Sequence, residues 1–267
     1  MTSINNSIKN KLLTRFIPFL TLIEREVGRT RRVIGQALIA PFVTASLYIF
    51  VFGYVIGSRI DNIEGIKYIS FVFPGIFTMN LILAVFGATS FTAFFMRFQK
   101  TLEDFLTLPI SYVELVLSMI VNGLFRGLAI MIALTCVGLL FGVNDFAHPF
   151  VLVLYVLLVS FVFGIMGMVV GIWADNSFEK LGLATNFVIT PLSFLGGAFY
   201  SSSMLPTNLQ FLVHLNPIFY AVDGIRYSLT GYHETSILLG VSILSGLAIV
   251  FLAFAVYIFQ TGWKLRS

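Results

Sequence analysis

The sequence predicts an all-α membrane protein with six transmembrane helices, on the basis of its composition, its long uncharged runs and its charge distribution. Of the 267 residues, 58% are hydrophobic and only 10% are charged. A soluble domain usually carries about a quarter charged residues. The composition therefore excludes a soluble enzyme, a nucleic-acid-binding domain and a disordered chain. It predicts a single membrane domain over residues 1–267, with a cytoplasmic or interfacial segment over 1–32 and the helices over 33–263.

The spans are read from the uncharged runs. A helix needs about 20 apolar residues to cross the hydrocarbon core of a bilayer. Runs of at least that length, one of them interrupted by a single arginine, occupy 33–58, 68–96, 115–144, 149–174, 181–222 and 235–263. The fifth run is too long for one helix and contains Pro191, Pro206 and Pro217, so we expect it to break after its span.

The segment before the first span predicts an amphipathic helix over 12–32. Apolar side chains recur there at spacings of three and four residues, at Leu12, Phe16, Leu20, Ile23 and Val27. Such a stripe is typical of a helix that lies in the membrane interface. The helix is either an anchor on the membrane surface or a lever that contacts a cytoplasmic partner, and the pattern leaves both open.

Basic residues orient the predicted helices. Twelve of them fall on the side that holds both termini: Lys9, Lys11, Arg15, Arg25, Arg29, Arg31, Arg32, Arg97, Lys100, Lys180, Lys264 and Arg266. The opposite side holds three: Arg59, Lys67 and Arg226. Because cytoplasmic loops carry the excess of Lys and Arg, both termini are predicted to be cytoplasmic.

A short cytosolic helix is predicted between the second and third spans. Thr101 and Asp104 have the spacing of a capping box, and Pro109 ends the helix. We expect this helix to expose apolar side chains beside acidic ones: Leu102, Phe105 and Leu106 beside Glu103 and Asp104. An exposed apolar knob suits docking into the groove of a partner. The alternative is a helix that lies back on the bilayer.

Two further short helices, over 207–215 and 217–230, are predicted after the fifth span. Asn216 followed by Pro217 is an N-cap and first-turn pair. The segment is too apolar for an open loop and too short to span, so re-entrant helices on the outer side fit. They form either a gate at an exit path or a cap that only packs, and the candidate gate residues are Pro206, Asn216, Pro217, Tyr220 and Arg226.

Arg126 is the single charge deep within a predicted span. Its burial in a membrane is costly, so it should face protein or water. It contacts an anionic substrate group or a second copy of the chain, or else it snorkels or bonds to a neighbour such as Asn122. The three histidines and the lone Cys136 have no metal-binding spacing, so no metal site is predicted.

The spacing of residues in the last third of the chain carries a resemblance. The pattern runs Leu192-x-x-Leu195-Gly196-x-Ala198, six residues, Leu205-Pro206, ten residues, Pro217-Ile-x-Tyr220, five residues, Arg226. It resembles the signature of the ABC-2 family of transporter permeases, within which the chain is most similar to the bacterial inner-membrane group of nodulation-factor and polysaccharide exporters. The six spans, the amphipathic segment and the capped loop before Pro109 also resemble that family.

The resemblance implies a type V exporter-like fold and a half-size permease that works as a dimer with two separate ATPase subunits. It implies that the helix beginning at Thr101 couples to the ATPase and that the N-terminal helix contributes to the contact. ATP and magnesium would be bound by the partner, since the chain has no GxxxxGK[ST] loop. The expected function is outward transport of a polysaccharide, glycolipid, lipid or drug across the bacterial inner membrane.

Two alternative functions would each need residues that the sequence lacks. An ATP-independent carrier or channel would need acids inside the spans for ion coupling, and the spans contain none. A membrane-embedded enzyme would need a cluster of nucleophilic or acid–base side chains at one depth, which the sparse charges do not supply. The sequence therefore predicts a transport subunit without catalytic residues of its own.

Overall fold

The computed structural model describes residues 2–57, 59–60, 62–106, 110–144, 146–175 and 177–264, with side chains described in these ranges except at 2–16, 18, 103, 104 and 106. The elements, in chain order, are α1 (Thr2–Tyr48), η1 (Ile49–Ile56), β1 (Asn62–Ile63), β2 (Ile66–Lys67), α2 (Tyr68–Phe98), α3 (Thr101–Leu106), α4 (Tyr112–Leu140), α5 (Pro149–Trp173), α6 (Glu179–Ala184), η2 (Thr185–Ile189), α7 (Thr190–Leu195), η3 (Ser202–Met204), α8 (Thr207–Leu215), α9 (Pro217–Thr230) and α10 (Ile237–Thr261).

The prediction of an all-α membrane protein is confirmed in its coarse form. Among the described residues, five helices are long and apolar enough to cross a membrane: Phe19–Ile56, Tyr68–Phe98, Tyr112–Leu140, Pro149–Trp173 and Ile237–Thr261. Within the described ranges, the strands form one antiparallel hairpin, which pairs Asn62 with Lys67 and Ile63 with Ile66. Its turn residues Glu64 and Gly65 both have positive φ, as a two-residue hairpin turn requires.

The fifth predicted span is shorter in the structure than in the prediction. Helices α6, η2 and α7 follow one another without interruption over 179–195. That stretch falls below the about 20 residues that a crossing helix needs. Pro191 lies at the start of α7 and has no N–H to donate, and the π-helical turn η2 directly precedes it. The backbone is therefore irregular where a regular span was expected.

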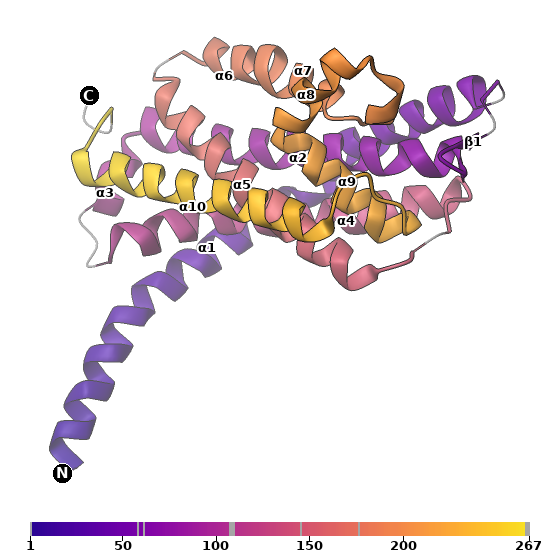
Figure 1. Cartoon of the computed structure of the whole chain (residues 1–267). Coiled ribbons are helices and arrows are strands. Elements are labelled where there is room, and N and C mark those ends of the chain that lie inside the picture. The colour runs from indigo at the N-terminus through magenta and orange to yellow at the C-terminus, as the bar shows by residue number, and fades with distance from the viewer. Residues whose placement is uncertain are drawn as a thin grey trace.

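The two ends of the bundle separate the loops into two groups (Figure 1). α3 and the C-terminal end of α10 lie at one end, while the β1–β2 hairpin lies at the other. The α5–α6 loop belongs to the first end, because its Asp175 forms an ion pair with Arg97 at the end of α2 and lies 3.9 Å from Nζ of Lys264. The loops predicted to share the cytoplasmic side thus lie together.

α2 is the central helix, and it packs most closely against α5. Its most apolar window is 83% buried, compared with 17% for α10. Two glycines of α5 permit the close approach. A Cβ on Gly167 would lie 2.5 Å from the carbonyl oxygen of Phe86, and one on Gly171 would lie 2.3 Å from that of Ser90. These two glycines therefore allow close helix packing within one chain.

The first span and the amphipathic segment form one continuous helix, which differs from the expected pair of elements. α1 runs from Thr2 into η1 without a break, and its N-terminal part extends away from the bundle (Figure 1). The charged residues at the expected junction do not end the helix, because Arg29 finds partners in Glu26 and Thr92. The basic junction is thus accommodated within helical backbone.

Candidate functional site

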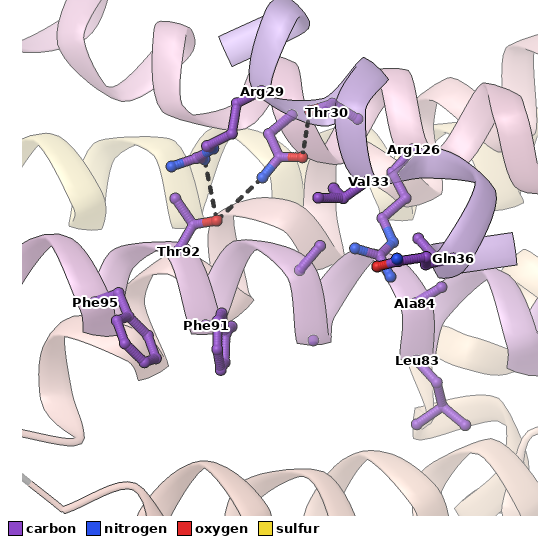
Figure 2. Close-up of a pocket in the computed structure, with 14 residues that line it drawn as sticks. Arg29, Thr30, Val33, Gln36, Leu83, Ala84, Phe91, Thr92, Phe95 and Arg126 are labelled. Atoms are coloured by element: carbon purple, nitrogen blue, oxygen red, sulfur yellow. Dashed lines mark hydrogen bonds between the residues drawn. The ribbon is translucent and has the colours of Figure 1, made fainter. Parts of the chain in front are cut away.

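A cavity of about 610 Å³ lies between α1, α2 and α4. Its walls are polar where α1 faces α4 and apolar along α2. The lining side chains include Arg29, Thr30, Val33, Gln36, Leu83, Phe91, Thr92, Phe95, Asn122 and Arg126. Figure 2 shows the two arginines on one side of the α2 ribbon, while Phe91, Phe95 and Leu83 point to the other side. We refer to this cavity as the α1–α2–α4 pocket.

A chain of hydrogen bonds joins the three helices at the pocket. Arg29 donates to Oγ1 of Thr92 over 3.1 Å, and the amide nitrogen of Asn122 donates to the same oxygen over 3.1 Å. The hydroxyl of Thr30 then donates to the amide oxygen of Asn122 over 2.8 Å. The network extends to Glu26, which forms an ion pair with Arg29. It fixes the walls of the pocket at the level of Thr92.

Arg126 lies in the same pocket but outside this network. It is fourteen residues beyond Tyr112, so it lies roughly 21 Å along α4 from the end that carries α3. Its Nε is buried, and that atom has no hydrogen-bond partner among the described residues. The expected bond to Asn122 is not made, because the amide of Asn122 is used by Thr30 and Thr92. Figure 2 places the guanidinium beside the side chain of Gln36 at the pocket wall.

The short helix α3 begins at Thr101 as predicted, but its apolar side chains point inward. Leu102 is 1% exposed and Phe105 is 6% exposed. Both belong to a cluster with Leu22 of α1, Met96 of α2 and Leu115 of α4. The prediction that Leu102 and Phe105 are exposed is therefore wrong, while their role in coupling stays a prediction. They are buried because α1, the end of α2 and the start of α4 supply an apolar surface on which α3 rests.

α3 also contacts α1 through an aromatic side chain. The guanidinium carbon of Arg25 lies 4.8 Å from the ring centroid of Phe105, within the range of a cation–π interaction. Along α1, Arg29 is one turn beyond Arg25 and lines the pocket. A side chain on α3 is thus one helical turn of α1 away from the pocket.

The caps around α3 differ in part from the sequence prediction. The hydroxyl of Thr101 donates to the carbonyl oxygen of Met96 over 3.1 Å. The side chains of Glu103, Asp104 and Leu106 lie outside the described residues, so their predicted roles remain predictions. A complete capping box occurs at the next helix, where Ser111 and Glu114 bond to each other's backbone N–H. The S-x-x-E spacing at 111–114 was the signal that sequence reasoning missed.

The face of α1 that packs on the bundle is not its predicted apolar stripe. Leu22, Glu26 and Thr30 are buried, and they lie one turn apart on one face. By contrast, Leu20 is 54% exposed, while Ile23 and Val27 are half-buried. The side chain of Phe16 lies outside the described residues. Polar side chains face inward here because Asn122 and Thr92 bind them, which leaves the apolar stripe on the outside.

At the opposite end of the bundle, α8 and α9 have the predicted bounds, Thr207–Leu215 and Pro217–Thr230. α8 begins immediately after Pro206. The side chain of Asn216 caps α9 by accepting from the N–H of Ile218 over 3.0 Å, and it donates to the carbonyl oxygen of Leu192 over 2.6 Å. The hydroxyl of Tyr220 donates to the carbonyl oxygen of His214 over 2.8 Å. The residues predicted to form the outer gate therefore fix the turn between α8 and α9 and tie it to α7.

Arg226 is the centre of a buried polar cluster at this end. Its side chain is fully buried and lies 3.0 Å from Oε1 of Glu234. It also donates to the carbonyl oxygen of Gly197 over 2.6 Å and lies 4.0 Å from the ring centroid of Phe71. Glu234 in turn accepts from the N–H of Ser202 over 2.8 Å. Arg226 thus connects α9 to α2, to the end of α7 and to the loop before α10.

Asp223 precedes Arg226 by three residues on α9, but its carboxylate has other partners. Its carboxylate accepts from the N–H groups of Glu234 and Thr235 over 2.7 and 2.9 Å. The pair of Arg226 is Glu234, which sequence reasoning did not select because it lies beyond the end of the helix. Burial and the carboxylate of Glu234 raise the pKa of Tyr232 in the same loop, so this phenol stays neutral.

Comparisons with known proteins agree with the resemblance. The sequence pattern of the ABC-2 type transporter family matches residues 18–230. The inner membrane transport permease YadH of Escherichia coli (strain K12) is 33% identical over 244 residues, which cover 91% of this chain and 94% of that protein. Nodulation protein J of Rhizobium leguminosarum bv. viciae is 28% identical over 205 residues, covering 74% and 76%. Nodulation protein J of Rhizobium meliloti (strain 1021) is 23% identical over 202 residues, covering 75% and 77%.

The family match covers most of the chain, and it includes the pocket, α3 and the cluster around Arg226. The relatives cover most of their own length as well. The chain therefore belongs to the ABC-2 type transporter family of membrane transport permeases.

Proposed function

We propose that the chain is the membrane subunit of an ATP-binding-cassette exporter, which moves a polysaccharide, glycolipid, lipid or drug outward and is powered by a separate ATPase. Two permease chains would work with two ATPase subunits, and the ATPase would bind ATP and magnesium. The proposed location is the bacterial inner membrane with both termini in the cytoplasm. The charge asymmetry of the loops and the name of the Escherichia coli relative support this location.

The observation that carries the proposal is the contact between α3 and α1. Phe105 lies against Arg25, and the next turn of α1 brings Arg29 to the wall of the α1–α2–α4 pocket. Leu102 and Phe105 are buried, so α3 cannot shift without moving the cluster that holds α1, α2 and α4 together. An ATPase that displaces α3 would thereby change the shape of the pocket.

The proposed path begins at this pocket and ends near the α8–α9 turn. The pocket occupies the half of the bundle nearer to α3, where a substrate would enter from the cytoplasmic side. The segment from Pro206 to Arg226 would act as the gate at the outer end, since Arg226 links it to α2 and α7. The chain itself would carry out no bond chemistry.

Purification tests the need for a separate ATPase. The tagged chain, purified alone, is expected to hydrolyse no ATP. The chain purified gently from its native membrane is expected to retain an ATPase subunit, identified by mass spectrometry, and to hydrolyse ATP. ATP turnover by the contaminant-free chain alone would contradict the proposal, and ion-gradient-driven transport by that chain would support an ATP-independent carrier instead.

A further inference from the structure

Arg126 is a cation without a counter-charge in the structure. It has no recorded ion pair or hydrogen bond in the part of the chain whose side chains are described, and its Nε is buried without a partner. The other arginine of the pocket differs, because Glu26 neutralises Arg29. The α1–α2–α4 pocket therefore carries about one unpaired positive charge. An uncompensated charge at this depth is unfavourable, so the site is poised for an anion.

A second copy of the chain does not supply this anion at the same depth. In the sequence, no Asp or Glu lies between Glu114 and Asp145, and the ranges of α2, α5 and α10 contain none. Glu114 is twelve residues from Arg126, or roughly 18 Å along the helix. A copy inserted in the same orientation has the acids of its long helices at the levels of Glu24, Glu26 and Glu114, toward the end of the bundle that carries α3. The counter-charge is therefore expected to come from a ligand.

The walls of the pocket also select for an apolar tail. Val33 is 46% exposed and Phe91 is 47% exposed, so the pocket opens at its rim. Leu83, Phe91 and Phe95 follow one another along α2 and are directed away from the two arginines (Figure 2). A ligand that fits both surfaces has an anionic head between Arg29 and Arg126 and an alkyl chain along α2.

We propose that the α1–α2–α4 pocket binds amphiphiles whose head group is a phosphodiester with a net charge of about −1. The single unpaired cation sets the charge, and the arginine fork together with the amide of Gln36 matches phosphate oxygens. The proposal rests on the function proposed above in taking this pocket as the place where the transported molecule enters. It narrows the substrate class to molecules that carry such a head group on a lipid chain.

Equilibrium binding to the purified full chain in maltoside micelles tests the proposal. The probe is radiolabelled lauroyl lysophosphatidylglycerol, and the matched competitor is lauroyl lysophosphatidylcholine, which has the same phosphodiester and chain but no net charge. We expect saturable binding of one probe per chain. Unlabelled probe should displace it, while lysophosphatidylcholine and inorganic phosphate at the same concentration should not.

Four variants test the location of the site. Arg126→Gln is expected to weaken binding tenfold or more, and Arg126→Lys should retain most of it. Val33→Trp, which fills the rim and keeps both arginines, should also weaken it. Arg59→Gln makes the same charge change at an exposed position near the opposite end and should leave binding unchanged. Equal affinity of Arg126→Gln and the wild type, or of the two lysolipids, would overturn the proposal.

Further measurements identify the source of the ligand and distinguish a failure of this inference from a failure of the proposed exporter function. If bulk phospholipid occupies the pocket, probe binding should be weaker in nanodiscs of phosphatidylglycerol than in nanodiscs of phosphatidylcholine. That result would support the same head-group chemistry. A chain that binds no probe while its ATPase complex still transports would overturn this inference alone. Probe binding that depends on Arg126, in a chain that retains no ATPase subunit when purified gently from its native membrane, would support the site and contradict the exporter function.

Discussion

Removal of either partner of the ion pair between Arg226 and Glu234 is expected to destabilise the outer end of the bundle. The proposed perturbation is a double-mutant cycle with Arg226→Met, Glu234→Gln and the double variant. Each single change leaves one buried charge without its partner, whereas the double change removes both charges. The double variant is therefore expected to be more stable than the sum of the two single effects implies.

The structure sets the magnitude of the single effects. The two side chains are 0% and 5% exposed and lie 3.0 Å apart, so water does not screen the pair. Breaking a buried pair by removing one partner costs about 3–5 kcal/mol. Arg226→Met also removes the bond to the carbonyl oxygen of Gly197 and the contact with Phe71, so it should lie at the upper end. Glu234→Gln keeps an oxygen for the N–H of Ser202 and should lie at the lower end.

Unfolding in detergent, followed by tryptophan fluorescence, measures these differences. The account predicts losses in the free energy of unfolding of about 3–5 kcal/mol for the single variants and an interaction energy of about 2 kcal/mol. Arg226→Lys is the control that keeps the charge and should cost less than Arg226→Met. Single effects below about 1 kcal/mol, or strictly additive effects, would refute the reasoning.

Three other outcomes follow from the structure. Gly167→Ala places a Cβ 2.5 Å from a backbone carbonyl of α2, and it should lower stability by about 1–3 kcal/mol in the same unfolding assay. Asn216→Ala removes the cap of α9 and the bond to α7, and it should cost about 2 kcal/mol there. In a chain that lacks Cys136, an impermeant maleimide should label Thr207→Cys in intact cells but not Lys100→Cys. The reverse labelling would contradict the proposed orientation.

Local signals account for what the sequence predicted well. The bounds of α8 and α9 follow from Pro206, Asn216 and Pro217, which act on the backbone next to them and need no tertiary information. The grouping of the loops follows from the alternation of the spans, and the ion pair of Arg97 with Asp175 agrees with it. Such features depend on neighbours in sequence or on simple counting.

The features that the sequence did not predict depend on distant partners. Phe105 looked exposed because its helix lies in a loop, yet Arg25 and Leu22, some 80 residues earlier, cover it. The polar face of α1 packs on the bundle because Arg29 binds Thr92 and Thr30 binds Asn122. The partner of Arg226 is a loop residue. No periodicity in the chain contains this information.

The central claim is that the ATPase reshapes the α1–α2–α4 pocket through α3 and α1. Spin labels at Val33→Cys and Ala84→Cys, on the two walls of the pocket and without Cys136, report its width by electron spin echo distance measurement. The account predicts that ATP and magnesium change this distance in the complex with the ATPase and leave it unchanged in the chain alone.

Two variants then test the route of that change. Arg25→Ala removes the contact with Phe105 and should reduce the ATP-dependent change, while Arg32→Ala, at an exposed position on the same helix, should preserve it. ATP hydrolysis by the complex should continue in both variants. A pocket whose width does not respond to ATP, or responds equally in Arg25→Ala and Arg32→Ala, would contradict the account.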